Sequence, residues 1–144
     1  MSSLTLETAS AMIDSALKTG REKKFMPLCV VVLDAGAHMI AMKREDGASI
    51  SRPEIAAGKA AGCLGMGMGG RALAKRYEAA PGLFVGAAAI MPKGVVPVAG
   101  GVLVRDGEGK IIGAIGISGD VSDNDEICAV AGVEAVGLKA DTGA

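Results

Sequence analysis

Apolar and polar positions in the first 43 residues follow a helical pattern and then two strand patterns. Leucine, alanine and isoleucine recur at 6, 9, 13, 16 and 17, the spacing of one helix face, behind Thr5, which can cap the helix, and the pattern stops near Gly20. Residues 28–34 (LCVVVLD) are almost all apolar and predict a buried strand. A turn at 34–37 returns the chain as a second strand at 38–43, so we expect a hairpin.

The rest of the chain continues as an alternation of helices and strands. Glycine and proline mark the breaks, and a DGEGK string predicts a hairpin turn. The expected elements are a polar loop at 44–52, a helix from Pro53 through 54–69, helical turns at 71–78, a break at 80–82, a strand at 102–106, a turn at 106–110, a strand from 111 and a closing helix at 128–138.

Four glycines in the second helix lie on one face, because Gly58, Gly62, Gly65 and Gly69 are spaced four, three and four apart. Each costs about 1 kcal/mol relative to alanine in a helix interior. We therefore expect a very close neighbour on that face, either a β-sheet, a symmetry-related helix or a flat ligand.

The stretch 111–130 (IIGAIGISGDVSDNDEICAV) is the most informative part of the chain. Its first residues are apolar on both faces, which predicts a central, covered strand. Gly116, Ser118 and Gly119 then lead into a cluster of acids. Glycine would let the backbone expose its N–H groups beside a helix start, an arrangement that favours an anion. The alternative is helix capping by Ser122 or Asp123, with Asp125 or Glu126 completing a capping box.

Hairpin connections between sequential strands predict an antiparallel sheet. With helices on one or both faces of that sheet, the expected fold is an α+β sandwich. At 144 residues, without a repeat or a low-complexity linker, the chain is expected to form a single domain, 1–144.

Composition excludes several classes of partner. The formal net charge is −1, no long block of like charge occurs, and only three residues are aromatic, so nucleic acid is not expected as a partner. No apolar stretch approaches the length that spans a bilayer, and the first ten residues lack a secretion signal, so no membrane association and a cytoplasmic location are expected. Three cysteines without a CxxC pair indicate buried free thiols.

Several strings of the sequence resemble the GlcG/HbpS family, which includes the C-terminal domain of PduO-type proteins and is often labelled haem-degrading or haem-binding. The resemblance covers nearly the whole chain. It rests on LTLETA at the first helix, VVVLDAGAHMIAMKREDGA across the hairpin, Gly58-Lys59-Ala60, Gly100-Gly101 and GAIGISGDVSDNDE. Two segments differ from the family pattern, KAAGCLGMGMGG from Lys59 and MPKGVV from Met91.

This resemblance implies a profilin-like three-layer α/β/α fold with a five-stranded antiparallel sheet, assembled as a homo-oligomer. Glycine- and alanine-faced helices, with a closing helix apolar around much of its circumference, also favour a homo-oligomer. Haem or another tetrapyrrole is the ligand implied by the resemblance, with His38 as a contact. From the residues alone, a single histidine at the edge of a turn is more often a hydrogen-bonded structural residue.

Further candidates for ligand binding are Arg44 and Lys59, which could clamp a carboxylate, and the backbone at Gly116, Ser118 and Gly119. A lysine in an alanine- and glycine-rich helix needs a partner or a cavity. No metal-ligand cluster and no Ser-His hydrolase arrangement can be assembled.

Two functions therefore stay open. The first is a protein that binds a small ligand, haem or another tetrapyrrole. The second is a cofactor-independent lyase, isomerase or hydratase acting on a small carboxylate, with Lys59, Asp125 and Glu126 as its acid-base candidates.

Overall fold

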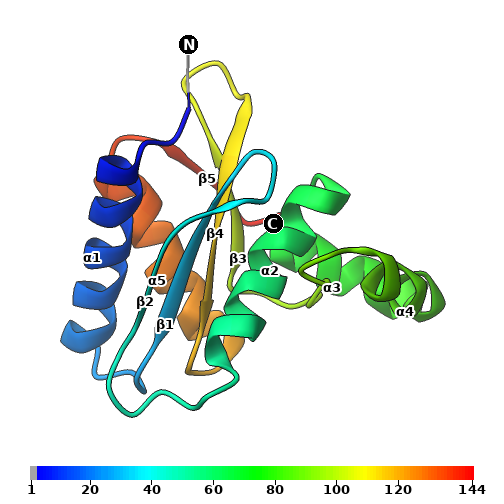
Figure 1. Cartoon of the computed structure of the whole chain (residues 1–144), viewed down its shortest axis with the longest axis horizontal. Coiled ribbons are helices and arrows are strands. Elements are labelled where there is room, and N and C mark those ends of the chain that lie inside the picture. Colours follow the sequence, from blue (N-terminus) through cyan, green and yellow to red (C-terminus); the bar gives the residue numbers. More distant parts are fainter. Residues whose placement is uncertain (1–2) are drawn as a thin grey trace.

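The computed structural model describes residues 3–144, which form an α+β fold of five helices around a five-stranded antiparallel sheet, as predicted (Figure 1). The sheet order is β2-β1-β4-β3-β5. The strands are β1 (Cys29–Asp34), β2 (Met39–Arg44), β3 (Gly101–Arg105), β4 (Ile111–Ser118) and β5 (Lys139–Asp141). The helices are α1 (Leu6–Glu22), α2 (Arg52–Met66), α3 (Gly70–Ala79), α4 (Pro81–Ile90) and α5 (Ser122–Ala135).

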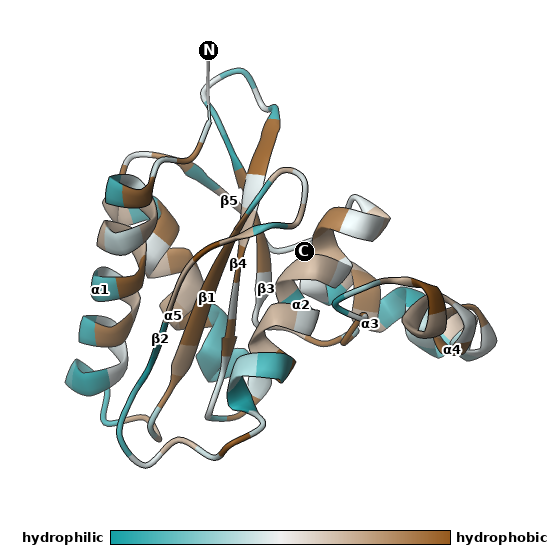
Figure 2. Ribbon diagram, viewed as in Figure 1, coloured by the Kyte–Doolittle hydropathy of each residue, from teal (hydrophilic) through white to brown (hydrophobic). Residues whose placement is uncertain are grey.

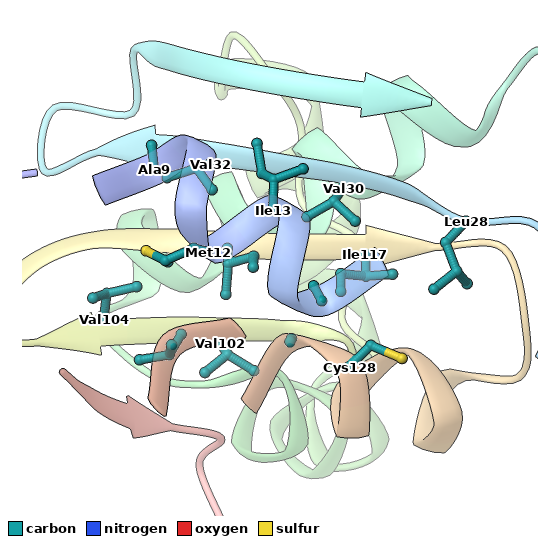
Figure 3. Packing of buried hydrophobic residues seen from close by; sticks show 14 of the residues in the cluster. Ala9, Met12, Ile13, Leu28, Val30, Val32, Val102, Val104, Ile117 and Cys128 are labelled. Atoms are coloured by element: carbon teal, nitrogen blue, oxygen red, sulfur yellow. The ribbon is translucent and has the colours of Figure 1, made fainter. Parts of the chain in front are cut away.

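Helices cover both faces of the sheet, so the molecule has three layers. On one face, α1 and α5 bury Met12, Ile13 and Cys128 against Val30, Val32 and other strand residues (Figure 3). On the other face, α2 packs on the alternate residues of the same strands, such as Val31 and Leu33. Strands buried on both sides read as continuous apolar runs, and this explains the sequence pattern of β1 and β4.

Glycine in β4 lets α2 approach the sheet at backbone distance. A Cβ atom added at Gly116 would collide with the carbonyl oxygen of Ala56 in α2. The helix therefore lies against the strand with no side chain between them at this point. Close backbone approach accounts for this glycine without a ligand.

A loop of the same chain covers the glycine face of α2, and this corrects the sequence interpretation. Because α2 ends at Met66, only Gly58, Gly62 and Gly65 lie on this face, while Gly69 precedes α3 and packs against residues 141–143. Residues 91–96 fold over this face. A Cβ at Gly58 would lie 2.8 Å from Cγ2 of Val96, and one at Gly62 would lie 2.7 Å from Cγ2 of Val95. The close neighbour was expected, but its identity as a loop was not.

Two elements, α4 and β5, were not predicted from the sequence. The expected break at 80–82 is a sharp corner, where Ala80 takes φ −145° and ψ 63°, but α4 begins directly after it with Pro81 at its first turn. Proline is compatible with that position because a first-turn N–H needs no helical partner. The closing helix was placed too late: α5 spans Ser122–Ala135, and Gly137 (φ +77°) turns the chain into β5.

The three cysteines are free and buried, as predicted. Burial raises the pKa of Cys29 and of Cys128 to about 11, and that of Cys63 to about 12. Across residues 3–144, no helix combines the length and the apolar character that crossing a membrane requires.

Candidate functional site

A cavity of about 370 Å³ lies between the β1–β2 turn, α2 and the segment that follows α4. It is near the lower end of the roughly 300–1,000 Å³ typical of small-molecule pockets. Its lining is mostly small or apolar, with one histidine and one lysine: Gly36, Ala37, His38, Ala61, Gly65, Met91, Pro92, Lys93 and Gly94. The sequence candidate His38 therefore lies at a cavity.

The β1–β2 turn fixes the position of His38 through Asp34. The Oδ1 atom of Asp34 accepts hydrogen bonds from the backbone N–H groups of Gly36 and His38, each 2.9 Å long. The N–H of His38 is the largest cause of a lowered Asp34 pKa. Ala37, between them, takes φ +65°, a left-handed conformation that residues other than glycine rarely adopt. Asp34 thus stabilises the turn that was expected at 34–37.

The imidazole of His38 uses one nitrogen toward Asp34 and leaves the other open. Nδ1 lies 3.4 Å from Oδ1 of Asp34, while 80 % of the side chain is exposed. Within the described part of the chain, Nε2 has no hydrogen-bond partner. A proton on Nδ1 can be shared with the carboxylate, and the lone pair of Nε2 is then available to a ligand.

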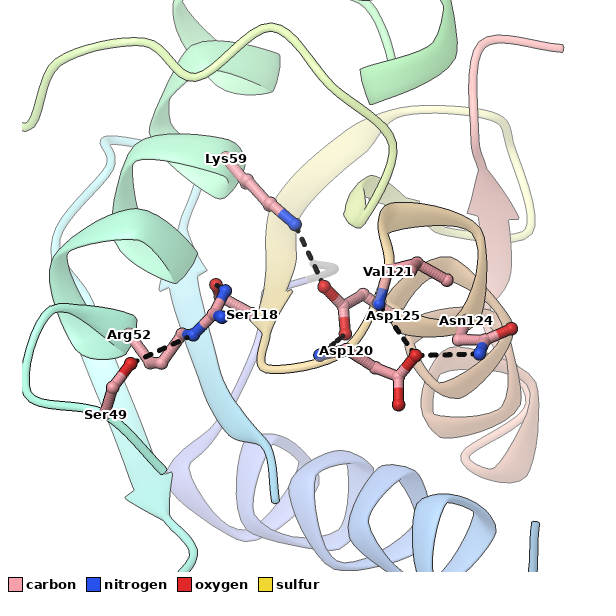
Figure 4. Close-up of polar contacts among 8 residues, drawn as sticks. All are labelled: Ser49, Arg52, Lys59, Ser118, Asp120, Val121, Asn124 and Asp125. Atoms are coloured by element: carbon pink, nitrogen blue, oxygen red, sulfur yellow. Dashed lines mark hydrogen bonds and ion pairs between the residues drawn. The ribbon is translucent and has the colours of Figure 1, made fainter. Parts of the chain in front are cut away.

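A second polar cluster joins the helical layers at the end of β4 (Figure 4). Nζ of Lys59 in α2 lies 3.1 Å from Oδ2 of Asp125 in α5, and the side chains are 4 and 0 % exposed. Oδ1 of the same carboxylate accepts the N–H of Asp120 at 2.9 Å. Burial lowers the pKa of Lys59 and raises that of Asp125, and the opposite charge of each partner counteracts both shifts.

The space around this pair is filled. A Cβ at Gly100 would lie 2.8 Å from Nζ of Lys59, and Gly100 itself takes φ +108°. Ser118 is fully buried and accepts a 3.0 Å hydrogen bond from Nη1 of Arg52. Lys59 was expected to need a partner or a cavity, and in the structure it has a partner, Asp125. The buried pair connects α2 to α5, and its burial leaves no access for a substrate.

The structure does not bring Arg44 and Lys59 together. Nη1 of Arg44 donates to the carbonyl oxygen of Ala48 at 2.9 Å, and its side chain borders a separate cavity with Arg21 and Glu45. The expected two-cation clamp is therefore wrong. Gly119 packs beneath the backbone of Pro27, so this loop backbone is covered, like that of Gly116.

Ser122 and Asp123 do not cap α5 as predicted, because both lie in its first turn. The N-cap is Val121, whose N–H donates to Oδ1 of Asp120 at 2.7 Å. Asp123 and Glu126 instead both pair with Arg71 of α3, each at 2.9 Å. Three acids of the cluster thus hold neighbouring segments in place, and Asp125 holds the buried lysine.

Sequence reasoning missed the wall of the cavity formed by residues 91–94. The one signal pointing to it was that MPKGVV differs from the family pattern. Met91 places its Cε over Gly65 of α2, and Lys93 is the one cationic side chain among the lining residues of the cavity.

A family model described as "Haem degrading protein HbpS-like" matches residues 4–134. This chain belongs to the HbpS-like family.

Solved structures agree with that assignment. HbpS itself is 30% identical, with a TM-score of 0.81 over 93% of this chain and 90% of that one. A double mutant of HbpS from Streptomyces reticuli is 29% identical, with a TM-score of 0.81 over 93% and 87%. PduOC, solved as a PduOC:heme complex, is 22% identical, with a TM-score of 0.85 over 97% and 99%, and shows the same fold. A comparison with curated protein sequences gives no match.

Proposed function

We propose that this HbpS-like protein binds haem at the His38 cavity, with Nε2 of His38 as an axial ligand of the iron. The observation that carries the proposal is the contact between Nδ1 of His38 and Asp34. Histidines that ligate metals almost always direct their other ring nitrogen at a carboxylate, a carbonyl or water, which fixes the tautomer and increases the basicity of the ligating nitrogen. The family description and the existence of a PduOC:heme complex support haem as the ligand.

The lining suits one end of a haem. Ala37, Ala61, Met91 and Pro92 offer an apolar wall for a macrocycle, and Lys93 offers a cation for a propionate. The cavity is smaller than a haem, so part of the macrocycle would extend beyond its rim. A bound haem would supply a redox-active iron, while the chain would supply its ligand, its wall and its counter-charge.

The second function, cofactor-independent catalysis on a small carboxylate, gains no support from the geometry. Lys59 and Asp125 are buried against each other, and Glu126 pairs with Arg71. These candidate acid-base groups hold the fold together and share no accessible cavity with Arg44. We therefore retain the binding function alone.

A hemin titration followed by absorbance tests the proposal. Wild-type protein should saturate with a shifted Soret band, and His38→Ala should lose that shift and bind at least tenfold more weakly. Met39→Ala is the matched control, because this neighbour is 48% exposed and lies outside the cavity lining. Equal binding by all three proteins would refute ligation by His38.

Asp34→Asn separates a positioning role from a structural one. Asparagine keeps an oxygen that can accept the two turn N–H groups but removes the negative charge beside Nδ1. We expect hemin affinity to fall about 10- to 100-fold, the range for such supporting partners, while the melting temperature changes little. A loss of stability with unchanged hemin affinity would contradict the role assigned to Asp34.

A further inference from the structure

The two segments in which this chain differs from the family pattern meet at the His38 cavity. Gly65 comes from the first, KAAGCLGMGMGG, and Met91 comes from the second, MPKGVV. A Cβ atom added at Gly65 would collide with Cε of Met91, and Sδ of Met91 lies 3.5 Å from the same point. The glycine in α2 leaves the space that the methionine side chain occupies, so the two differences form one feature of the cavity.

Hydrogen bonds hold the backbone around Met91 in place. Its N–H donates to the carbonyl oxygen of Ala87 at 3.0 Å, and its carbonyl oxygen accepts the N–H of Gly94 at 2.9 Å. Further along the segment, the N–H of Val96 donates to the carbonyl oxygen of Gly58 in α2 at 3.2 Å. The thioether is therefore carried by a fixed backbone, while its unbranched side chain keeps three rotatable bonds.

Three side chains in the lining carry an atom that can bind iron. They are the imidazole of His38, the thioether of Met91 and the amine of Lys93. Lys93 must first lose a proton, because an ammonium group has no lone pair. A thioether carries no proton, and methionine is an established axial ligand of haem iron. Met91 is therefore the second donor that is ready to bind.

The imidazole and the thioether reach the cavity from different walls. His38 belongs to the β1–β2 turn, whereas Met91 belongs to the segment that follows α4. The His38 side chain is 80% exposed and Met91 is half-buried, so neither is enclosed in the core. A flat ring between these walls can face the imidazole on one side and the thioether on the other.

We infer that Met91 is a second axial ligand of the haem iron, opposite His38, and that it makes the site selective for ferrous over ferric haem. This inference rests on the function proposed above. A thioether is a soft ligand, and paired Met and His ligands raise the reduction potential of haem iron. The alternative is that Met91 only fills the space over Gly65, and leucine could then replace it without any effect on the iron.

The surroundings of Met91 favour the same oxidation state. Helix α4, which ends one residue before Met91, has the sequence PGLFVGAAAI without a charged side chain, and its ribbon is largely coloured as hydrophobic (Figure 2). Ala87 of this helix and Met91 pack against the same buried cluster. Ferric iron adds a positive charge, which an apolar environment disfavours. The ligand and its environment therefore act in the same direction.

Labelling the methionine ε-methyl groups with ¹³C tests the ligand directly. In the dithionite-reduced hemin complex, the methyl group of a ligating methionine should show a resonance far upfield, because the ring current of the macrocycle shields it. One of the eight methionine signals should move in this way, and Met91→Leu should remove it. Met68→Leu is the matched control, because Met68 packs against the same buried cluster but borders a separate cavity.

Hemin titrations of the oxidised and the reduced protein measure the selectivity. Leucine and methionine have similar volumes, so the melting temperature of haem-free Met91→Leu should stay close to that of wild type. This variant should lose at least tenfold more affinity for ferrous than for ferric haem, which corresponds to a decrease of about 59 mV in the one-electron reduction potential. Met68→Leu should leave both affinities unchanged.

An upfield methyl signal that Met91→Leu removes and Met68→Leu retains supports the inference. A hemin complex that depends on His38 but has no such signal in wild type would overturn the inference and leave the proposed function intact. The inference would also fail if Lys93→Met abolished six-coordination while Met91→Leu preserved it. Wild-type protein without saturable hemin binding would overturn both the inference and the proposed function.

Discussion

Removing the charge of Lys59 should test whether the buried pair with Asp125 stabilises the fold. Lys59→Met keeps most of the aliphatic stem but leaves the Asp125 carboxylate buried at 0% exposure with one hydrogen bond, from the N–H of Asp120. Breaking a buried pair by removing one partner costs about 3–5 kcal/mol. For a domain of this size, where each kcal/mol changes the melting temperature by roughly 3–4 °C, the expected decrease is about 10–20 °C.

Urea denaturation of the wild type, Lys59→Met, Asp125→Asn and the double variant Lys59→Met/Asp125→Asn measures the coupling between the two residues. Removing both charges eliminates the unpaired carboxylate, so the double variant should be more stable than Lys59→Met alone. Asparagine retains an oxygen for the N–H of Asp120. A Lys59→Met variant within 1 kcal/mol of wild type, or a double variant whose loss equals the sum of the two single losses, would refute the reasoning.

Three further predictions concern packing, thiols and pH. Gly116→Ala should lower the free energy of unfolding, measured in urea, by about 1–3 kcal/mol or more, because its methyl would meet the Ala56 carbonyl. Gly107→Ala, where a Cβ meets nothing, should leave stability nearly unchanged, and equal effects of the two substitutions would contradict the close approach of α2. The three buried thiols, whose pKa values are raised to about 11–12, should react with Ellman's reagent at pH 8 only on unfolding, and rapid labelling of the native protein would contradict their burial. Hydrogen bonds lower the pKa of Asp120 in the folded state, and the largest cause is the one from the N–H of Met26. The ionised carboxylate therefore stabilises the fold above its ordinary pKa near 4, and this stabilisation is lost as the pH falls through the lowered pKa. Asp120→Asn should therefore reduce the loss of stability on acidification below pH 4, and an unchanged acid limb of the stability curve would exclude this contribution.

Local patterns predicted most of the elements because their causes are local. Thr5 caps α1 through its side-chain oxygen, and β1 and β4 are apolar on both sides because helices cover both faces of the sheet. Helix α4 escaped prediction for an equally local reason. Proline and glycine at its start signal a break, and an uncharged helix without a polar face gives no periodic contrast.

The site was predictable only in part, because its partners are distant in sequence. His38 was identified from the sequence, and its contact with Asp34 spans only one turn. The wall at residues 91–94 lies more than fifty positions further on and reaches the cavity because it folds over the glycines of α2. Similarly, the sequence indicated that Lys59 needs a partner or a cavity but not which, and only the fold places Asp125 beside it.

The most direct test of the proposed haem site uses the fact that the chain has a single histidine. In untagged protein labelled with ¹⁵N-histidine, NMR should show two ring nitrogens, both from His38. Titration with zinc protoporphyrin IX, which is diamagnetic and takes one axial nitrogen, should shift the Nε2 resonance strongly while Nδ1 keeps its proton toward Asp34. Saturable binding of the porphyrin with both nitrogen resonances unchanged would contradict ligation by His38, and with it the proposed function of this cavity.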